Sequence, residues 1–144
     1  MSKIADIMST DVKTVQPQES LRRAAQYMQE LDVGALPVCD GERLLGMLTD
    51  RDITVRGIAD GMDPDHACVS DIMTAEVDYV MADQDVEDAK RLMGERQIRR
   101  LPVVDAARRL VGIVSLADLA LRDGGDMDRA VREISEPTNV REAA

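Results

Sequence analysis

The sequence is 144 residues long, enough for one compact domain or for two small halves that share a core. Its net charge of −10 disfavours contact with nucleic-acid phosphates, and without Trp or Phe it lacks the aromatic surfaces on which single strands stack. Two cysteines are too few for a disulfide scaffold, the N-terminus lacks a signal peptide's apolar core, and no apolar run reaches the roughly 20 residues of a membrane span. We therefore expect a soluble, cytoplasmic protein with an aliphatic core.

The first half of the chain predicts a short helix, a brief extended piece, a second helix, two strands and a third helix. After the break at Pro17, apolar residues recur at helical spacing and predict one buried helix face: Leu21, Ala24, Ala25, Met28 and Leu31. The strands "ALPVC" (35–39) and "LLGML" (44–48) flank Asp40-Gly41, a strong hairpin signal. The third helix is expected from Thr49 to about Gly57.

The second half repeats the first. "DIM" at 6–8 recurs at 71–73, and "LPV" at 36–38 recurs at 101–103, both at an offset of 65 residues. The offset becomes 66 beyond the hairpin turn, where "DGER" is replaced by the longer "DAARR". We therefore predict two copies of one unit at 3–57 and 69–122, a surface linker at 58–68, and a C-terminal helix with a flexible tail at 123–144.

Each copy contains a glycine, two apolar residues, a hydroxyl and then an acid, as "GMLTDRD" (46–52) and "GIVSLAD" (112–118). One interpretation is a capping box, in which Thr49 and Ser115 cap helices and the acids bond back. The other is a ligand site. An ionised carboxylate, Asp52 or Asp118, can accept both hydroxyls of a ribose, and a hydroxyl at a helix start can donate to a phosphate. The two interpretations are compatible.

Two copies of "DIM", a helix, "LPV" and G-h-h-[ST]-x-x-D (h apolar) resemble a tandem pair of cystathionine-β-synthase-type domains, known as a CBS pair or Bateman module. The resemblance covers about residues 3 to 122 and is greatest to stand-alone bacterial members. It implies an α/β (α+β) fold of two β-α-β-β-α repeats packed about a pseudo-twofold axis, often assembled as homodimers. It also implies binding of AMP, ADP or ATP, or else of S-adenosylmethionine or NAD, although some members bind no ligand.

The resemblance also implies the residues of two ligand sites. In the first, Thr49 and Asp52 join Tyr79, Val80, Arg99 and Arg100, with Gly34 and Ala35 near the base. In the second, Ser115 and Asp118 join Thr14, Val15, Val33 and Gly34. The copies differ before the proline, where "VGALP" stands against "IRRLP", so Arg99 and Arg100 are either phosphate ligands or a solvated strand end.

Taken together, these features favour a stand-alone regulatory module that senses adenosine nucleotides and signals through its conformation or through an unknown regulated protein. The alternative is a ligand-free, dimeric interaction or stress-response protein. Catalysis is not expected, because no catalytic set surrounds the single histidine, and His66 with Cys68 is too few for a structural zinc site. The helices after Thr49 and Ser115 carry apolar residues that predict a homodimer face: Ile53, Val55, Leu119 and Leu121.

Overall fold

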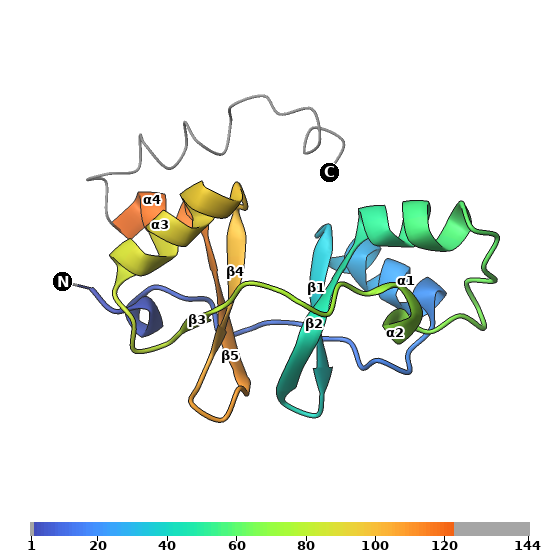
Figure 1. The fold of residues 1–144 in the computed structure, drawn as a ribbon, viewed down its shortest axis with the longest axis horizontal. Coiled ribbons are helices and arrows are strands. Elements are labelled where there is room, and N and C mark those ends of the chain that lie inside the picture. The colour runs from blue at the N-terminus through green and yellow to red at the C-terminus, as the bar shows by residue number, and fades with distance from the viewer. Residues whose placement is uncertain (1, 123–144) are drawn as a thin grey trace. The chain divides into compact units, whose positions relative to one another are not determined.

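The computed structural model describes residues 2–122, which form two compact units (Figure 1). Unit 1 contains residues 2–12 and 78–122, and unit 2 contains residues 13–77. Each unit has its own aliphatic core. The predicted C-terminal helix around Met127 lies outside the described residues.

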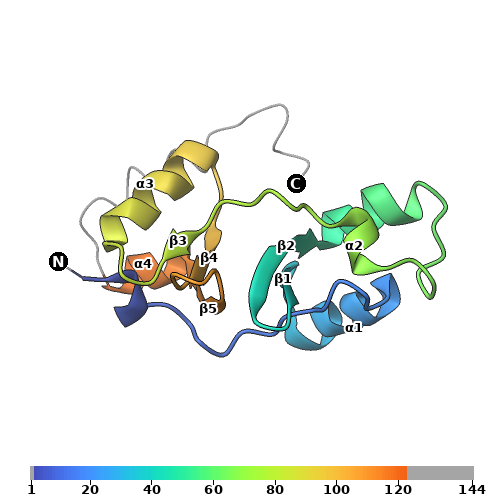
Figure 2. The same cartoon turned by 60° about the horizontal axis from the view of Figure 1, so that its bottom comes forward.

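Unit 2 is a two-stranded antiparallel hairpin with helices on one side (Figure 2). Its elements are α1 (Leu21–Leu31), β1 (Ala35–Asp40), β2 (Arg43–Thr49), η2 (Asp52–Ile58) and α2 (Val69–Ile72). The element η2 is a π-helix, preceded by two α-helical residues, 50 and 51. The helix predicted from Thr49 to about Gly57 is therefore present, with a wider hydrogen-bonding pattern than an α-helix.

Helix α1 is well defined at both ends by its sequence. The Ser20 hydroxyl accepts a hydrogen bond from the Arg23 N–H at 3.1 Å, which satisfies one of the free N–H groups at the helix start. Asp32 ends the helix with φ of +54°, the left-handed conformation common after a last turn. The predicted apolar face is confirmed as buried at Leu21, Ala24 and Met28. Ala25 is half-buried, and the prediction is wrong for Leu31, which is 50% exposed in the last turn of the helix.

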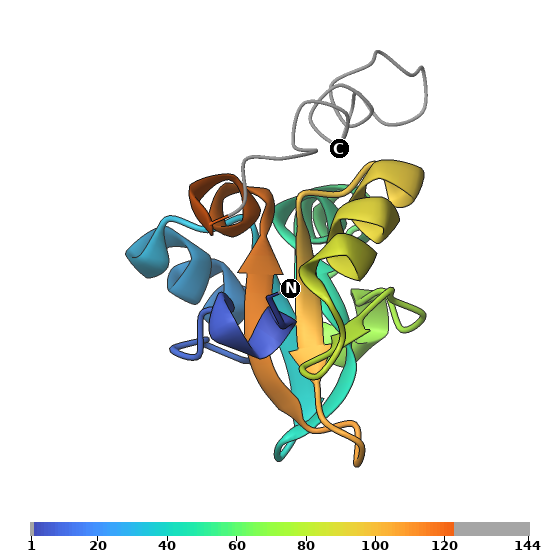
Figure 3. The same cartoon turned by 90° about the vertical axis from the view of Figure 1, so that its left-hand side faces the viewer.

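Unit 1 combines a three-stranded sheet, in the order β3-β4-β5, with two longer helices (Figures 1 and 3). Strand β3 runs parallel to β4, and β4 runs antiparallel to β5. The elements are η1 (Ile4–Asp6), β3 (Val80–Met81), α3 (Val86–Arg96), β4 (Arg100–Val104), β5 (Leu110–Ser115) and α4 (Leu116–Arg122).

The strand that opens each β-α-β-β-α repeat differs between the units, and Pro17 explains why. In unit 1, the Ala82 N–H donates to the Val104 carbonyl at 3.1 Å, next to β3. The equivalent position in unit 2 is Pro17, which has no N–H to donate. Unit 2 therefore keeps only the single parallel bridge between Val15 and Val38.

Each repeat begins with a short opening segment, residues 4–9 in the first and 69–74 in the second. Each opening segment packs in the unit that contains the hairpin of the other repeat. Ile4 and Ile7, from the start of the chain, are buried in the core of unit 1. Their equivalents, Val69 and Ile72, are buried in the core of unit 2. Figure 3 shows the first opening segment, in blue, beside the orange β5, more than 100 residues later in the sequence.

The last residue of each opening segment pairs with the edge strand of a hairpin, as a one-residue strand would. Ser9 and Ile113 exchange two backbone hydrogen bonds of 2.8 and 2.9 Å, and Thr74 and Met47 exchange two of 2.9 and 3.0 Å. These bonds fix residues 4–9 to β5 and residues 69–74 to β2.

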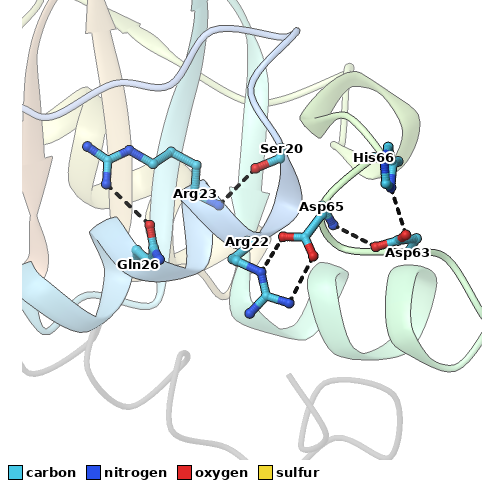
Figure 4. Close-up of polar contacts among 7 residues, drawn as sticks. All are labelled: Ser20, Arg22, Arg23, Gln26, Asp63, Asp65 and His66. Carbon is cyan, nitrogen blue, oxygen red and sulfur yellow. Dashed lines mark hydrogen bonds and ion pairs between the residues drawn. The ribbon is translucent and has the colours of Figure 1, made fainter.

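The linker between the repeats docks on the start of α1 (Figure 4). The Arg22 guanidinium forms an ion pair with Asp65, and the backbone N–H of Arg22 donates to the Pro64 carbonyl at 2.9 Å. Asp63 accepts from the Asp65 N–H at 2.9 Å and pairs with His66, whose Nδ1 lies 2.7 Å from the Asp63 carboxylate. The linker is therefore a folded turn held by polar contacts, and most of its residues are exposed.

Candidate functional site

The end of the β1–β2 hairpin opposite its turn holds the first hydroxyl–acid motif. We call residues 33–35 and 49–52 the first open end. The Asp52 N–H donates to the Thr49 hydroxyl at 3.0 Å, and the Thr49 N–H donates to the Asp52 carboxylate, also at 3.0 Å. The other Asp52 oxygen lies 3.9 Å from the Arg56 guanidinium. The capping box predicted from "TDRD" is therefore formed, with Asp52 mostly buried.

Unit 1 repeats this geometry at its second open end, residues 98–100 and 115–118. The Asp118 N–H donates to the Ser115 hydroxyl at 3.1 Å, and the Ser115 N–H donates to the Asp118 carboxylate at 2.9 Å. In both motifs the hydroxyl can still donate its own proton, and the carboxylate keeps lone pairs for further donors. Capping therefore leaves the polar groups that a ribose or a phosphate requires.

The residues before each "LP" pair lie beside these motifs. Ala35 pairs with Thr49 across the first hairpin, and Arg100 pairs with Ser115 across the second. Arg99 and Arg100 are both exposed, so the second open end carries two cationic side chains close to its hydroxyl–acid motif. Backbone pairing within one hairpin thus places Arg99 and Arg100 beside Ser115 and Asp118, although the resemblance assigns the two pairs to different ligand sites.

The other predicted site residues fall into two groups. Val15 and Val80 are fully or almost fully buried in the cores of units 2 and 1, so their side chains serve packing. Thr14 and Val33 are half-buried, and Tyr79 is exposed with the Arg108 guanidinium 5.2 Å from its ring centre. The sharing of ligand contacts among residues of the two repeats stays a prediction.

The cysteines and the histidine do not form a cluster with metal-ligand geometry. In the described part of the chain, no group of three or more His, Cys, Asp or Glu side chains is placed to hold a metal ion. Burial raises the pKa of the Cys39 thiol to about 11, which keeps it protonated at neutral pH. No helix of residues 2–122 is both long enough and apolar enough to cross a membrane.

The helices that follow the two motifs leave part of their apolar surface exposed. Val55 of η2 is 45% exposed, and its equivalent in α4, Leu121, is 85% exposed. Ile58 is also exposed, whereas Ile53 is half-buried. The prediction that Leu119 belongs to this uncovered surface is wrong, because its side chain is fully buried in the core of unit 1.

Comparison with known proteins identifies the repeat. The model of the CBS domain matches the chain twice, over residues 4–56 and 69–123. The chain belongs to the CBS domain family. Both the resemblance noted in the sequence and the fold class of two α/β CBS repeats are thereby confirmed.

Similar proteins include several that consist of little more than a CBS pair. Hypoxic response protein 1 of Mycobacterium tuberculosis is 46% identical over 121 residues, covering 83% of this chain and 84% of that protein. A crystal structure of Hypoxic Response Protein I with two coordinated zinc ions has a TM-score of 0.77 at 45% identity, covering 84% of this chain and 98% of the other.

A further solved structure is the CBS domain pair of protein MJ0100 in complex with 5′-methylthioadenosine and S-adenosyl-L-methionine. It has a TM-score of 0.73 at 29% identity, covering 88% of this chain and 98% of the other. Inosine-5′-monophosphate dehydrogenase of Methanocaldococcus jannaschii also matches, at 35% identity over 85% of this chain, but the match spans only 24% of that enzyme. The relatives matched over most of their length thus include CBS proteins without a catalytic domain.

Sequence reasoning missed the first of the two residues between the hydroxyl and the acid of each motif. Asp50 follows Thr49, and Leu116 follows Ser115, at equivalent positions of the two open ends. The Asp50 carboxylate lies over Gly34, 3.2 Å from the position that a Cβ of residue 34 would occupy. The sequence signal for this residue was the difference between "TDRD" and "SLAD". That difference becomes informative only once the structure shows that the Asp50 side chain lies beside Gly34.

Proposed function

We propose that this protein is a stand-alone regulatory module that binds adenosine nucleotides, AMP, ADP or ATP, and signals through its conformation or a partner protein. The observation that carries the proposal is the repeated hydroxyl–acid motif, formed identically in both units and flanked in unit 1 by Arg99 and Arg100. The CBS pair solved with two adenosyl compounds supports adenosine as the common ligand group.

Each residue type has a chemical role in this proposal. Asp52 and Asp118 accept hydrogen bonds from ribose hydroxyls, because a carboxylate offers about four lone-pair positions and the cap uses one. The hydroxyls of Thr49 and Ser115 each donate one further hydrogen bond to the ligand. Arg99 and Arg100 supply charge-assisted hydrogen bonds to phosphate. With no Phe or Trp in the chain, adenine packs against aliphatic side chains and bonds to the backbone.

The proposal is tested by thermal unfolding of the full chain with AMP, ADP, ATP, S-adenosylmethionine and NAD. A ligand at about 100 times its dissociation constant stabilises the folded state by roughly 2.7 kcal/mol, which raises Tm by several degrees for a chain of this size. Asp52→Asn and Asp118→Asn preserve an oxygen that can accept the cap bond but remove the charge, so they reduce the rise in Tm.

The matched control is Asp71→Asn. Asp71 accepts the Cys68 N–H at 2.8 Å, the same kind of cap bond, outside both open ends. Asp71→Asn should leave the ligand-induced rise in Tm unchanged. If no adenosine compound raises Tm, or if Asp71→Asn reduces the rise as much as Asp52→Asn and Asp118→Asn do, the sensor proposal is wrong.

We also propose that the chain assembles as a homodimer through η2 and α4. Val55 and Leu121 occupy equivalent positions on the two helices, and a lone chain exposes both to water. Light scattering of the full chain at micromolar concentration should give about twice the 15.8 kDa chain mass, and Val55→Lys should shift it towards one chain. A wild-type particle of one chain mass would contradict the homodimer.

A further inference from the structure

The two open ends occupy equivalent places in their units but carry opposite charge. The Asp50 N–H donates to the Gly34 carbonyl at 2.9 Å, and the Leu116 N–H donates to the Arg99 carbonyl at 2.7 Å. These bonds show that Asp50 and Leu116 hold the same position relative to their own hairpins. At three equivalent positions the first open end therefore has Gly34, Ala35 and Asp50 where the second has Arg99, Arg100 and Leu116. At a fourth, Arg51 of the first open end stands where the second has Ala117, so the first open end has a net charge of −1 and the second of +1.

The Asp50 carboxylate is held in a defined place at the first open end. One carboxylate oxygen, Oδ1, accepts the Arg51 N–H at 2.8 Å. The other, Oδ2, lies 3.2 Å from the position of a Cβ on Gly34. A negative charge thus lies beside residue 34, whose equivalent in unit 1 is the cationic Arg99.

The net charges of the two units differ in the same direction, although both are negative. Unit 2 has six basic and twelve acidic residues, a net charge of −6, whereas residues 2–12 and 78–122 have nine basic and ten acidic residues, a net charge of −1. An anion approaching the first open end therefore meets a more negative potential, as well as the fixed carboxylate of Asp50.

We infer that Asp50 is a specificity-determining residue, which keeps phosphate away from the first open end and reserves it for an adenosine compound that has no 5′-phosphate. Such a ligand is a neutral nucleoside or one with a cationic 5′-substituent, which the carboxylate attracts. Phosphate-bearing ligands then bind at the second open end. The inference rests on the proposed function. It assigns adenosine compounds without a 5′-phosphate to the first open end and phosphate-bearing ones to the second.

The size of the effect follows from the charges and their exposure. Asp50 is exposed, so water and salt weaken its repulsion of a phosphate a few ångströms away. Neutralising it should strengthen AMP binding at the first open end about three- to thirtyfold. Neutral adenosine carries no charge for the carboxylate to repel, so its affinity should change less than twofold.

The test is calorimetric titration of AMP and of adenosine into the full chain, with three variants. Asp50→Asn keeps the shape of the side chain and an oxygen for the Arg51 N–H, and removes the charge. Leu116→Asp introduces the acid at the equivalent position of the second open end. Asp60→Asn removes one exposed negative charge elsewhere in unit 2 and is the control for net charge.

Asp50→Asn should tighten AMP alone, Leu116→Asp should weaken AMP alone, and Asp60→Asn should match the wild type. If Asp50→Asn leaves AMP binding at the wild-type or Asp60→Asn level, or alters AMP and adenosine equally, the inference is overturned while the proposed function stands. If neither compound binds to any variant or to the wild type, both the proposed function and the inference are overturned.

Discussion

The carbonyl oxygen of Thr74 occupies the space that a Cβ atom on Gly46 would need. This close approach accompanies the two backbone hydrogen bonds between Thr74 and Met47, which hold the second opening segment on β2. In unit 1, a Cβ on Gly112 would lie 2.8 Å from the Ser9 carbonyl and 2.7 Å from the Met8 sulfur. The glycine of G-h-h-[ST]-x-x-D is therefore where each hairpin receives the other repeat's opening segment.

Gly46→Ala should destabilise the protein by about 2–4 kcal/mol, because the new methyl group displaces residues 73–75 and breaks their bonds to β2. Gly112→Ala should cost less, because the Met8 side chain can move and the Ser9 carbonyl, 2.8 Å from the new Cβ, is less crowded than the Thr74 carbonyl at Gly46. Gly61→Ala is the control: it has a strained φ of +79° but no neighbour within 4 Å, so it should cost about 1–2 kcal/mol. Urea unfolding measures all three, and a Gly46→Ala cost equal to that of Gly61→Ala would contradict the packing described.

The exchange of opening segments predicts which fragments fold. A fragment of residues 1–61 follows the first sequence repeat but lacks Val69 and Ile72, which fill the core of unit 2. It also leaves Ile4 and Ile7 without the core that buries them. A fragment of residues 13–77 contains its whole core and should be the more structured of the two by circular dichroism. Cooperative melting of fragment 1–61 at a temperature equal to that of fragment 13–77 would contradict this.

The sequence was sufficient for the repeat, the hairpins and α1, because each depends on local signals. The offset of 65 residues, the Asp40-Gly41 turn and the spacing of Leu21, Ala24 and Met28 are all visible without a structure. Where the opening segments pack could not be predicted, because that is decided by contacts between residues far apart in the chain. The loss of the first strand at Pro17 could have been inferred, since its equivalent is Ala82.

Stability should depend weakly on pH through the pair of Asp63 and His66. The hydrogen bond and the attraction of Asp63 raise the pKa of His66 above its usual value. The Asp65 N–H first, and His66 second, lower the pKa of Asp63. The stabilisation by His66 is therefore full below its unfolded pKa and lost as the pH rises through its folded pKa. That by Asp63 is present above its unfolded pKa and lost as the pH falls through its folded pKa.

The pair should thus contribute most between about pH 4 and pH 6.5, the usual pKa values of Asp and His. Because both groups are exposed, the effect should be small. Titration of the His66 imidazole by NMR should give a pKa above that of the unfolded chain, and Asp63→Asn should lower it. An identical His66 pKa in wild type and Asp63→Asn would contradict the contact.

The two thiols should react at different rates. Cys39 is buried, with its pKa raised to about 11, whereas Cys68 is partly exposed. Because the thiolate is the reactive form, iodoacetamide at pH 8 should modify Cys68 in the folded protein and Cys39 only after unfolding. Peptide mass spectrometry after a short exposure distinguishes them, and equal labelling of both would contradict the burial of Cys39.

The capping geometry at the candidate site could be predicted from the sequence for a physical reason. A hydroxyl and an acid three residues apart at the start of a helix form reciprocal bonds wherever they occur, so the geometry of Thr49 and Asp52 followed from the sequence. The placement of the Asp50 carboxylate beside Gly34 depends on the pairing of two strands and was not visible in the motif.

Calorimetric titration of AMP and adenosine into wild type and Arg100→Ala tests the central claim most directly. If Arg100 binds phosphate, its truncation removes a charge-assisted hydrogen bond worth about 1.5–3 kcal/mol and weakens AMP roughly ten- to a hundredfold. Adenosine should bind both proteins alike, and Arg109→Ala, which removes an arginine paired with Asp105 at the hairpin turn, should behave as wild type. AMP affinity that is unchanged by Arg100→Ala, or an absence of AMP binding to the wild type, would contradict the account.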